Sequence, residues 1–136
     1  MAVIGRRWTR LFPGRRRARS ITLSDPVHLP QFRVETGNVA GTTVVAVTGE
    51  LDIATTPELR AALQQVAEPF VVDLTSVTFM DSTGLATMIK TADAHPSGFA
   101  IACPEGPARL LFAVTGTEEE LPVYDSREAA LRAVGG

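Results

Sequence analysis

The sequence has few of the side chains that most often hold metals or carry redox chemistry. Among its 136 residues are one cysteine, Cys103, and two histidines, His28 and His95. A single cysteine excludes an internal disulfide, and the apolar run 99–103 predicts an inert, buried thiol. The histidines stand far apart and near prolines, which predicts exposed loop residues and no metal site. Nothing in the composition indicates a cofactor.

Several longer patterns are also missing. No apolar run approaches 18 residues, which argues against a membrane-spanning helix. The 11 glycines are scattered at turns and form no phosphate-binding loop of the Walker or dinucleotide type. Ser82 lacks the Gly-x-Ser-x-Gly context of a hydrolase nucleophile, and His95 follows it by about three helical turns. We therefore expect a protein that is not an enzyme, in a cytoplasmic location.

The charges are divided unevenly along the chain. The net charge is −2, yet the first 19 residues contain no acid and seven arginines, at positions 6, 7, 10, 15, 16, 17 and 19. The rest of the chain carries all 15 acids and fewer than half of the 13 Lys and Arg residues. This predicts a basic N-terminal extension and linker at 1–30 and an acidic domain at 31–136. Because an acidic domain repels phosphates, we expect no direct DNA binding.

The basic extension allows two interpretations. Apolar side chains recur at helical spacing between its arginines: Ile4, Trp8, Leu11 and Phe12. This pattern fits weak contact with a membrane surface or a nucleic acid. The favoured interpretation is a disordered arm, with 20–30 as a linker that contains two prolines. A twin-arginine export signal is excluded, because no apolar stretch follows Arg6 and Arg7.

The remaining sequence predicts one small α/β domain. Strands are expected at 31–36, 42–48, 69–74, 99–103 and 121–124, and helices beginning at 56, 81, 107 and 125. The first two strands, joined by a turn at 37–41, form an antiparallel hairpin. Later strands alternate with helices, which predicts parallel pairing and right-handed crossovers. The expected fold is a mixed, mostly parallel β-sheet packed against about four α-helices.

A short polar segment, Asp81-Ser82-Thr83-Gly84, lies at the centre of the chain between a buried strand and a helix. The helix is indicated by apolar side chains at i, i+3, i+4 and i+7: Leu85, Met88, Ile89 and Ala92. An aspartate and a serine at a helix start can cap its free backbone N–H groups. A hydroxyl there can also accept a phosphate in a favourable field. Ser82 is therefore either a cap or a switch.

Three acids lie near the expected ends of neighbouring strands. Asp73 is placed at the end of the central strand, Asp52 in the loop after the second strand, and Asp81 directly before Ser82. The carboxyl ends of parallel strands share one edge of a sheet, where ligands and partners usually bind. Asp52 and Asp81 can be plain loop and cap residues, or they can form one acidic face with Ser82.

Two stretches resemble a known family. Thr48-Gly49-Glu50-Leu51-Asp52, and then Leu74 followed by Phe79-Met80-Asp81-Ser82-Thr83-Gly84-Leu85, are similar to the STAS domain of bacterial anti-sigma factor antagonists. The spacing to Ala-Arg-Leu-Leu-Phe at 108–112 is similar too. The resemblance covers about residues 31–134 and leaves the N-terminal extension outside.

The resemblance implies a regulatory switch without catalysis. Such antagonists bind a GHKL-type serine kinase that doubles as an anti-sigma factor, and so free the sigma factor. The kinase phosphorylates the motif serine, which matches Ser82, and a PP2C-type phosphatase reverses this. Asp52 and Asp81, with Thr83 and Gly84, match positions at the partner-binding site.

Two other functions compete with the switch. One is a non-phosphorylated STAS subunit of a phospholipid-transport ATPase complex, to which the basic, Trp-bearing extension gives some weight. The other is an enzyme or a nucleotide-binding protein, which no motif supports beyond a helix start that could hold a phosphate. The oligomeric state is left open, since the first strand offers an edge for pairing.

Overall fold

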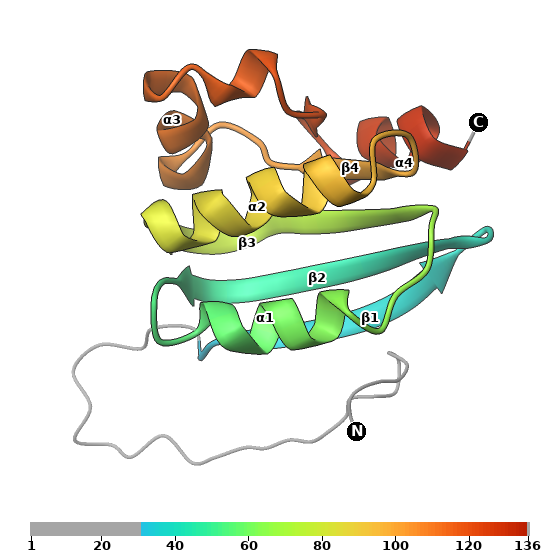
Figure 1. The fold of residues 1–136 in the computed structure, drawn as a ribbon, viewed down its shortest axis with the longest axis horizontal. Helices are drawn as coiled ribbons and strands as arrows, with labels where there is room; N and C mark the ends of the chain where they lie inside the picture. The colour runs from blue at the N-terminus through green and yellow to red at the C-terminus, as the bar shows by residue number, and fades with distance from the viewer. Residues whose placement is uncertain (1–30, 136) are drawn as a thin grey trace.

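The computed structural model describes residues 31–135 as one α/β domain with a five-stranded sheet in the order β1-β2-β3-β4-β5. The predictions for residues 1–30 and for Gly136 lie outside the described residues. The elements follow in the order β1 (Arg33–Val39), β2 (Thr42–Leu51), α1 (Thr56–Leu63), β3 (Phe70–Met80), α2 (Ser82–Ala94), β4 (Phe99–Ala102), α3 (Pro107–Val114), η2 (Thr117–Glu119), β5 (Val123–Tyr124) and α4 (Arg127–Gly135). Figure 1 shows α1 and α2 lying in front of the sheet, along its strands.

The pairing of the strands confirms the predicted topology. β1 and β2 form an antiparallel hairpin, whereas β2–β3, β3–β4 and β4–β5 are parallel. The hairpin turns at Ala40 and Gly41, whose φ angles of 52° and 92° place both in the left-handed region. Such a pair fits the right-handed twist of the two strands. Each parallel connection carries a helix, which brings the next strand back in the same direction.

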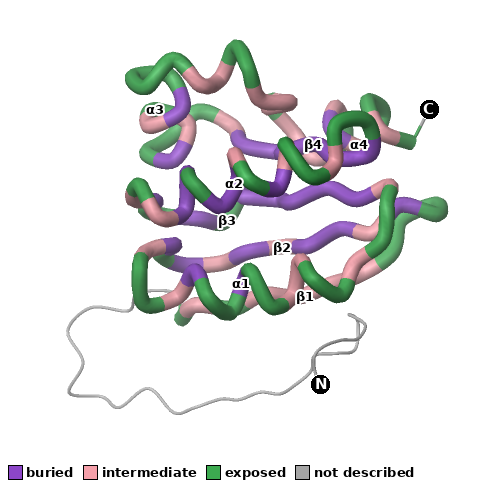
Figure 2. The backbone as a smooth tube through the Cα atoms, viewed as in Figure 1, coloured by how far each residue is buried: buried purple, intermediate pink, exposed green. Residues whose placement is uncertain are grey.

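Alternating side chains of the central strands fill two cores of unequal size. Phe70, Val72 and Leu74 of β3 pack in the larger core, which includes Leu59 of α1 and Met88 of α2. On the opposite side of the sheet, a smaller core joins a few strand residues to α4: Val71, Ala100, Ala102 and Ala130. Figure 2 shows the buried positions concentrated along β2, β3 and β4. The sheet is therefore covered on both faces in its middle, as expected for parallel strands.

Several predicted boundaries are wrong. The central strand continues to Met80 instead of ending at 74, the first strand continues to Val39, and the second reaches Leu51. The last strand has only the two residues Val123 and Tyr124, and part of the acidic loop at 118–120 is the 3-10 helix η2. The full length of β3 was not predicted because the second half of the strand has no regular alternation of buried and exposed residues. Its exposed positions are Thr75, Ser76, Thr78 and Phe79, and its buried ones are Val77 and Met80. Two register shifts against β2 accompany this irregular pattern.

The extension of β3 to Met80 leaves Asp73 away from the carboxyl end of the strand. Asp73 lies in the middle of the strand, 2% exposed, and its Oδ2 accepts a hydrogen bond from Arg127 Nε at 2.7 Å. Its Oδ1 accepts the Thr75 backbone N–H at 2.9 Å. Asp73 is therefore an internal ion-pair partner that fastens α4 to the sheet, and it does not end the central strand.

The prediction for His95 also needs correction, and that for Cys103 is confirmed. His95 is only partly exposed: its Nδ1 lies 2.6 Å from Glu68 Oε2, and its ring meets Phe70 edge-on. Cys103 is 1% exposed, and burial raises the pKa of its thiol to about 11. A thiol with such a pKa stays protonated and unreactive at neutral pH.

Candidate functional site

Asp81 is the cap of helix α2. Its backbone is extended, with φ −104° and ψ −171°, and its Oδ1 accepts the backbone N–H groups of Thr83 at 2.8 Å and Gly84 at 3.3 Å. The Thr83 hydroxyl donates to the same oxygen at 2.5 Å. This hydroxyl is the main reason why the pKa of Asp81 is lowered, with the N–H groups of Gly84, Thr83 and Ile53 adding to it against partial burial. The charged carboxylate is therefore the form that the helix start stabilises.

Ser82 takes no part in the hydrogen bonds that cap α2. It is the first residue of α2, its side chain is exposed, and its hydroxyl makes no hydrogen bond with any group in the described range 31–135. The neighbouring Thr83 has its hydroxyl committed to Asp81 and is only partly exposed. Of the two hydroxyls in the segment, the one at Ser82 is the one presented to solvent at the positive end of a helix.

Gly84 allows the start of α2 to lie close to the sheet. A Cβ at this position would come within 2.6 Å of Met80 Cγ and 3.1 Å of Leu51 Cγ, both in buried side chains. Gly84 has no side chain and is itself buried, so a partner cannot contact it directly. The glycine sets how deeply α2 sits, and through this the position of Ser82.

The loop before α1 is held in one shape by its own polar groups. Asp52 Oδ1 accepts the backbone N–H groups of Ala54 at 3.0 Å and Thr55 at 3.1 Å. The Thr55 hydroxyl donates to the Glu50 carbonyl at 2.7 Å and accepts the Asp52 N–H at 2.9 Å. The Thr56 hydroxyl donates to the Asp52 carbonyl at 2.6 Å. Asp52 therefore holds the loop before α1 in shape without capping the helix, since the N-cap of α1 is Thr55, which makes no side-chain cap hydrogen bond.

The structure brings this loop against the start of α2, as the sequence predicted for Asp52 and Asp81. The Asp81 backbone N–H donates to the Leu51 carbonyl at 3.1 Å. The Ile53 N–H also contributes to the lowered pKa of the Asp81 carboxylate. Thr56 Oγ1 lies 3.5 Å from Thr83 Oγ1; both protons are used elsewhere, so this is a packing contact. We call the two segments, residues 51–56 and 81–84, the double-loop platform.

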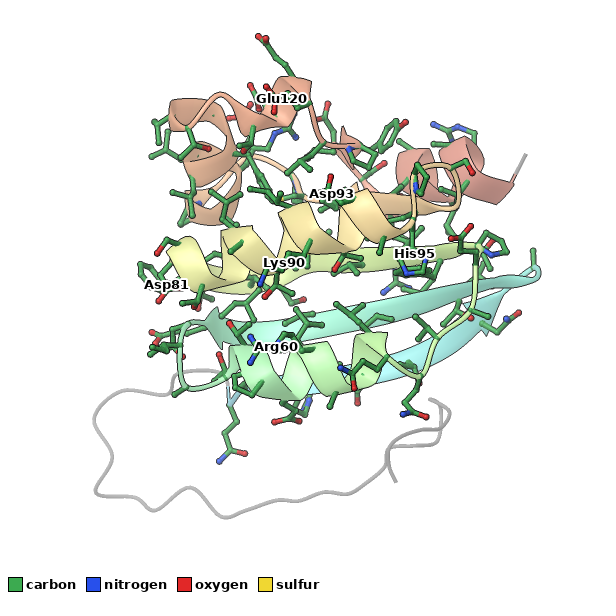
Figure 3. All side chains as sticks on the ribbon, viewed as in Figure 1. Arg60, Asp81, Lys90, Asp93, His95 and Glu120 are labelled. Atoms are coloured by element: carbon green, nitrogen blue, oxygen red, sulfur yellow. The ribbon has the colours of Figure 1, made fainter. Side chains whose placement is uncertain are left out.

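The platform carries negative charge without a counter-ion. Within residues 31–135, neither Asp52 nor Asp81 forms an ion pair with a basic side chain. Figure 3 shows Asp81 at the start of α2, with Arg60 and Lys90 between α1 and α2 further along the helices. The exposed Glu50 precedes the platform at the end of β2. The arrangement favours a partner that brings positive charge to this edge.

Sequence reasoning missed three residues of this region. Ile53 is 74% exposed and Phe79 is 46% exposed, so two large apolar side chains border the platform. Thr56 is fully buried and fills the space between the two helix starts. A signal for Ile53 was present, since a large aliphatic residue in a short polar loop has no core to enter. No such signal marks Thr56, whose role depends on a contact 27 positions away.

Other kinds of site are not found in the part of the chain that the structure describes. No three His, Cys, Asp or Glu side chains gather there in a way that could hold a metal ion. Among the described helices, none has both the length and the apolar character that a membrane crossing requires.

Comparison with solved structures finds clear relatives of the fold. The crystal structure of an anti-sigma factor antagonist from Mycobacterium paratuberculosis is 29% identical, covers 78% of this chain and 96% of its own, and has a TM-score of 0.73. The anti-sigma factor antagonist SpoIIAA in its unphosphorylated form is 22% identical, with coverage of 78% and 99% and a TM-score of 0.54. A sulfate transporter family protein from Wolinella succinogenes is 16% identical, with coverage of 71% and 87% and a TM-score of 0.58.

The last two likenesses, at low identity, concern the fold alone. No curated protein gives a sequence match. The sequence model of one family, described as the STAS domain, matches residues 33–130, which is most of the chain and includes the whole double-loop platform. The chain belongs to the STAS domain family.

Proposed function

We propose that the protein is an anti-sigma factor antagonist that works by partner switching. In its unphosphorylated form it binds an anti-sigma factor, a GHKL-type serine kinase, and thereby frees a sigma factor. Phosphorylation of Ser82 ends this binding, and a PP2C-type phosphatase restores it. The relative from Mycobacterium paratuberculosis, which shares this fold along nearly its full length, supports the general role. The protein itself acts as a substrate and binding partner, without catalysis.

The observation that carries the proposal is that the four residues at the start of α2 have different structural roles. Asp81 caps the helix, the Thr83 hydroxyl supports Asp81, and Gly84 permits close packing. Of the residues 81–84, only Ser82 is exposed, and its hydroxyl makes no hydrogen bond with any group in residues 31–135. A side chain that contributes neither to the cap nor to the core can be modified without unfolding the domain.

Electrostatics explains why modification should release a partner. A phosphate on Ser82 adds about −1.5 to −2 charges at pH 7. The helix start accepts this charge, since the N-terminus of a helix carries about half a positive charge. The platform already holds Asp52 and Asp81 without counter-ions. A partner surface fitted to the neutral serine would then face uncompensated negative charge and lose the contact, while the fold stays intact.

The remaining predicted residues take separate roles in this proposal. Asp52 offers Oδ2, which forms no hydrogen bond or ion pair within residues 31–135, to a basic side chain of the partner. Asp81 lies beside the phosphorylated serine and keeps the helix start in place. Thr83 and Gly84 contribute to partner binding through the position that they give to Ser82. The domain boundary at 31 stays a prediction.

A kinase assay tests the proposal directly. The full chain is incubated with ATP and each GHKL-type serine kinase of the source organism, and the modified residue is located by mass spectrometry. We expect one phosphate on Ser82, none in Ser82→Ala, and unchanged phosphorylation in the control Ser76→Ala, which removes another exposed serine. Phosphate on a different residue, or on none with any kinase, contradicts the proposal.

Binding measurements test the switch itself. Ser82→Ala should bind the kinase at least as tightly as wild type, and Ser82→Asp should bind it much more weakly. Ser82→Asp should unfold at the wild-type temperature or above, since a negative charge at the first helical position is favourable. Ser82→Ala should not unfold at a lower temperature, since the hydroxyl that it removes makes no hydrogen bond within residues 31–135. Equal affinities of the two variants would refute release by charge.

The transport-complex alternative differs in one measurable respect. The transporter-family neighbour supports the fold only, at 16% identity. A phospholipid-transport subunit would co-sediment with liposomes through the N-terminal extension, and its Ser82 would stay unmodified under every kinase. Co-sedimentation of the full chain, compared with a chain that starts at Gln31, separates the two functions.

A further inference from the structure

Ile53 is an exposed apolar side chain beside the proposed phosphorylation site. It is 74% exposed, and neither hydrophobic core includes it. Its position is fixed all the same, because the hydrogen bonds of Asp52 and Thr55 hold its loop and the Asp81 N–H donates to the carbonyl of Leu51, at the start of that loop. An isoleucine held rigidly in solvent contributes nothing to folding. It gains free energy only when another surface covers it.

A second exposed apolar side chain borders the platform. Phe79 is 46% exposed and pairs in register with Glu50. The next rung of the ladder, Leu51 with Met80, leads directly into the two loops. Ile53 and Phe79 both lie at the carboxyl ends of β2 and β3, where partners usually dock on parallel sheets. Because Leu51 and Met80 face the larger core, the Phe79 side chain faces the opposite side of the sheet, and Ile53 is the apolar side chain of the platform itself.

We propose that Ile53 is the apolar anchor by which this chain selects its partner, and that the partner presents an apolar pocket with a basic rim. The inference rests on the proposed function, since the occupant is the anti-sigma factor kinase that modifies Ser82. Asp52 and Asp81 draw the basic rim towards the platform, and Ile53 fills the pocket. Apolar anchors surrounded by polar contacts commonly carry most of the affinity of such interfaces.

The charges argue against a second copy of this chain as the occupant. A symmetric contact through the platform would place Asp52, Asp81 and Glu50 opposite the same acids of the other copy. None of these acids has a basic partner among residues 31–135 to soften that repulsion. Like charges brought together in an interface disfavour it, whereas a partner with lysines or arginines gains from them.

The anchor also gives the phosphate a stronger effect. A partner pocket that closes over Ile53 excludes water from the adjoining Ser82. A phosphate on Ser82 would then have to lose its hydration as well as face the two carboxylates. Contact with Ile53 holds the partner against Ser82, and the affinity therefore depends on whether Ser82 carries a phosphate.

The test compares two exposed aliphatic side chains in the full-length protein. Calorimetry measures the binding of the phosphorylating kinase to wild type, Ile53→Ala, Phe79→Ala and the control Leu110→Ala, whose leucine is 61% exposed on α3. We expect Ile53→Ala to weaken binding by about 10-fold or more. Phe79→Ala should weaken it less, and Leu110→Ala should leave it unchanged. The thermal unfolding midpoint of Ile53→Ala should equal that of wild type, because the side chain is solvated.

The outcomes separate this inference from the proposed function. If wild type is phosphorylated on Ser82 and binds the kinase, but Ile53→Ala binds equally well, the anchor is refuted and the function stands. Equal losses in Ile53→Ala and Leu110→Ala also refute it, since the effect would then be general. If wild type binds no kinase, function and anchor both fall. Concentration-dependent dimers of wild type in sedimentation velocity, absent in Ile53→Ala, would assign the patch to a second copy instead.

Discussion

The contact between Gly84 and the sheet makes a prediction in which two physical effects have opposite signs. Replacing glycine by alanine inside a helix normally stabilises it, by about 1 kcal/mol. Here the added Cβ would lie 2.6 Å from Met80 Cγ and 3.1 and 3.2 Å from two atoms of Leu51. These atoms cannot easily move away, because Met80 is 4% exposed and Leu51 fully buried.

The clash should outweigh the gain in helix propensity. Forcing an extra carbon into a packed core destabilises by about 1 to 3 kcal/mol. After subtraction of the propensity gain, we expect Gly84→Ala to lower the free energy of unfolding by about 1 kcal/mol. For a domain of roughly 100 residues, this corresponds to a fall of about 4 to 8 °C in the unfolding midpoint.

Urea unfolding of four proteins checks the reasoning: wild type, Gly84→Ala, Met80→Ala and the double variant. Met80→Ala removes the Cγ that the new Cβ would strike, so in that background Gly84→Ala should become neutral or stabilising. The coupling free energy between the two changes should reach about 1 kcal/mol or more. If Gly84→Ala stabilises the otherwise unchanged protein, the close approach of α2 to the sheet is not a constraint and the argument fails.

Three further predictions concern groups with defined partners. Asp81→Ala should lower the free energy of unfolding by about 1 kcal/mol at pH 7. Because folding lowers the pKa of Asp81, this loss of stability should be complete above the usual pKa of 3.8 and should shrink as the pH falls below it. Urea titrations of both proteins at pH 7 and pH 3 measure it. Arg127→Ala should lower the free energy of unfolding by about 3 kcal/mol, because it leaves the Asp73 carboxylate, which is 2% exposed, without its ion-pair partner. Asp73→Asn should cost less, because the Arg127 side chain that remains is reached by water. Chemical denaturation that shows equal effects would contradict this. Cys103, with a pKa of about 11, should resist alkylation in the native protein at pH 8 and react in urea, and rapid native labelling would show that the thiol is accessible.

Much of the fold could be predicted because its signals are local. The period of Leu85, Met88 and Ile89 marked α2, and the break at Asp81 marked its start to within one residue. The length of β3 could not be read in the same way. Its second half is bordered on one side only by β2, since β4 pairs with residues 70–73 alone. A strand with so little cover has an irregular burial pattern, which resembles that of a loop.

The site was predicted in its location but less well in its division of roles. Asp52 and Asp81 could be placed together because parallel strands end at one edge. That Asp81 caps the helix while Ser82 stays unused depends on side-chain directions, which the sequence does not show. Thr56 could not be assigned, since its role depends on a contact with Thr83. Ile53 could have been, because a large aliphatic side chain in a short polar loop has no core to enter, but this signal was not used.

The way the two loops are joined determines how a charge at Ser82 can act. The Asp81 N–H donates to the Leu51 carbonyl, and the Thr56 and Thr83 hydroxyls pack against each other, so separating the two loops would break this hydrogen bond and this contact. Both interactions oppose a withdrawal of the Asp52 loop that would lower the repulsion between Asp52 and a phosphate on Ser82. The phosphate, Asp52 and Asp81 then stay close together at the surface, and a docking partner is exposed to their combined negative charge. Because the helix start favours the same charge, the free energy of modification should appear in binding and hardly at all in folding.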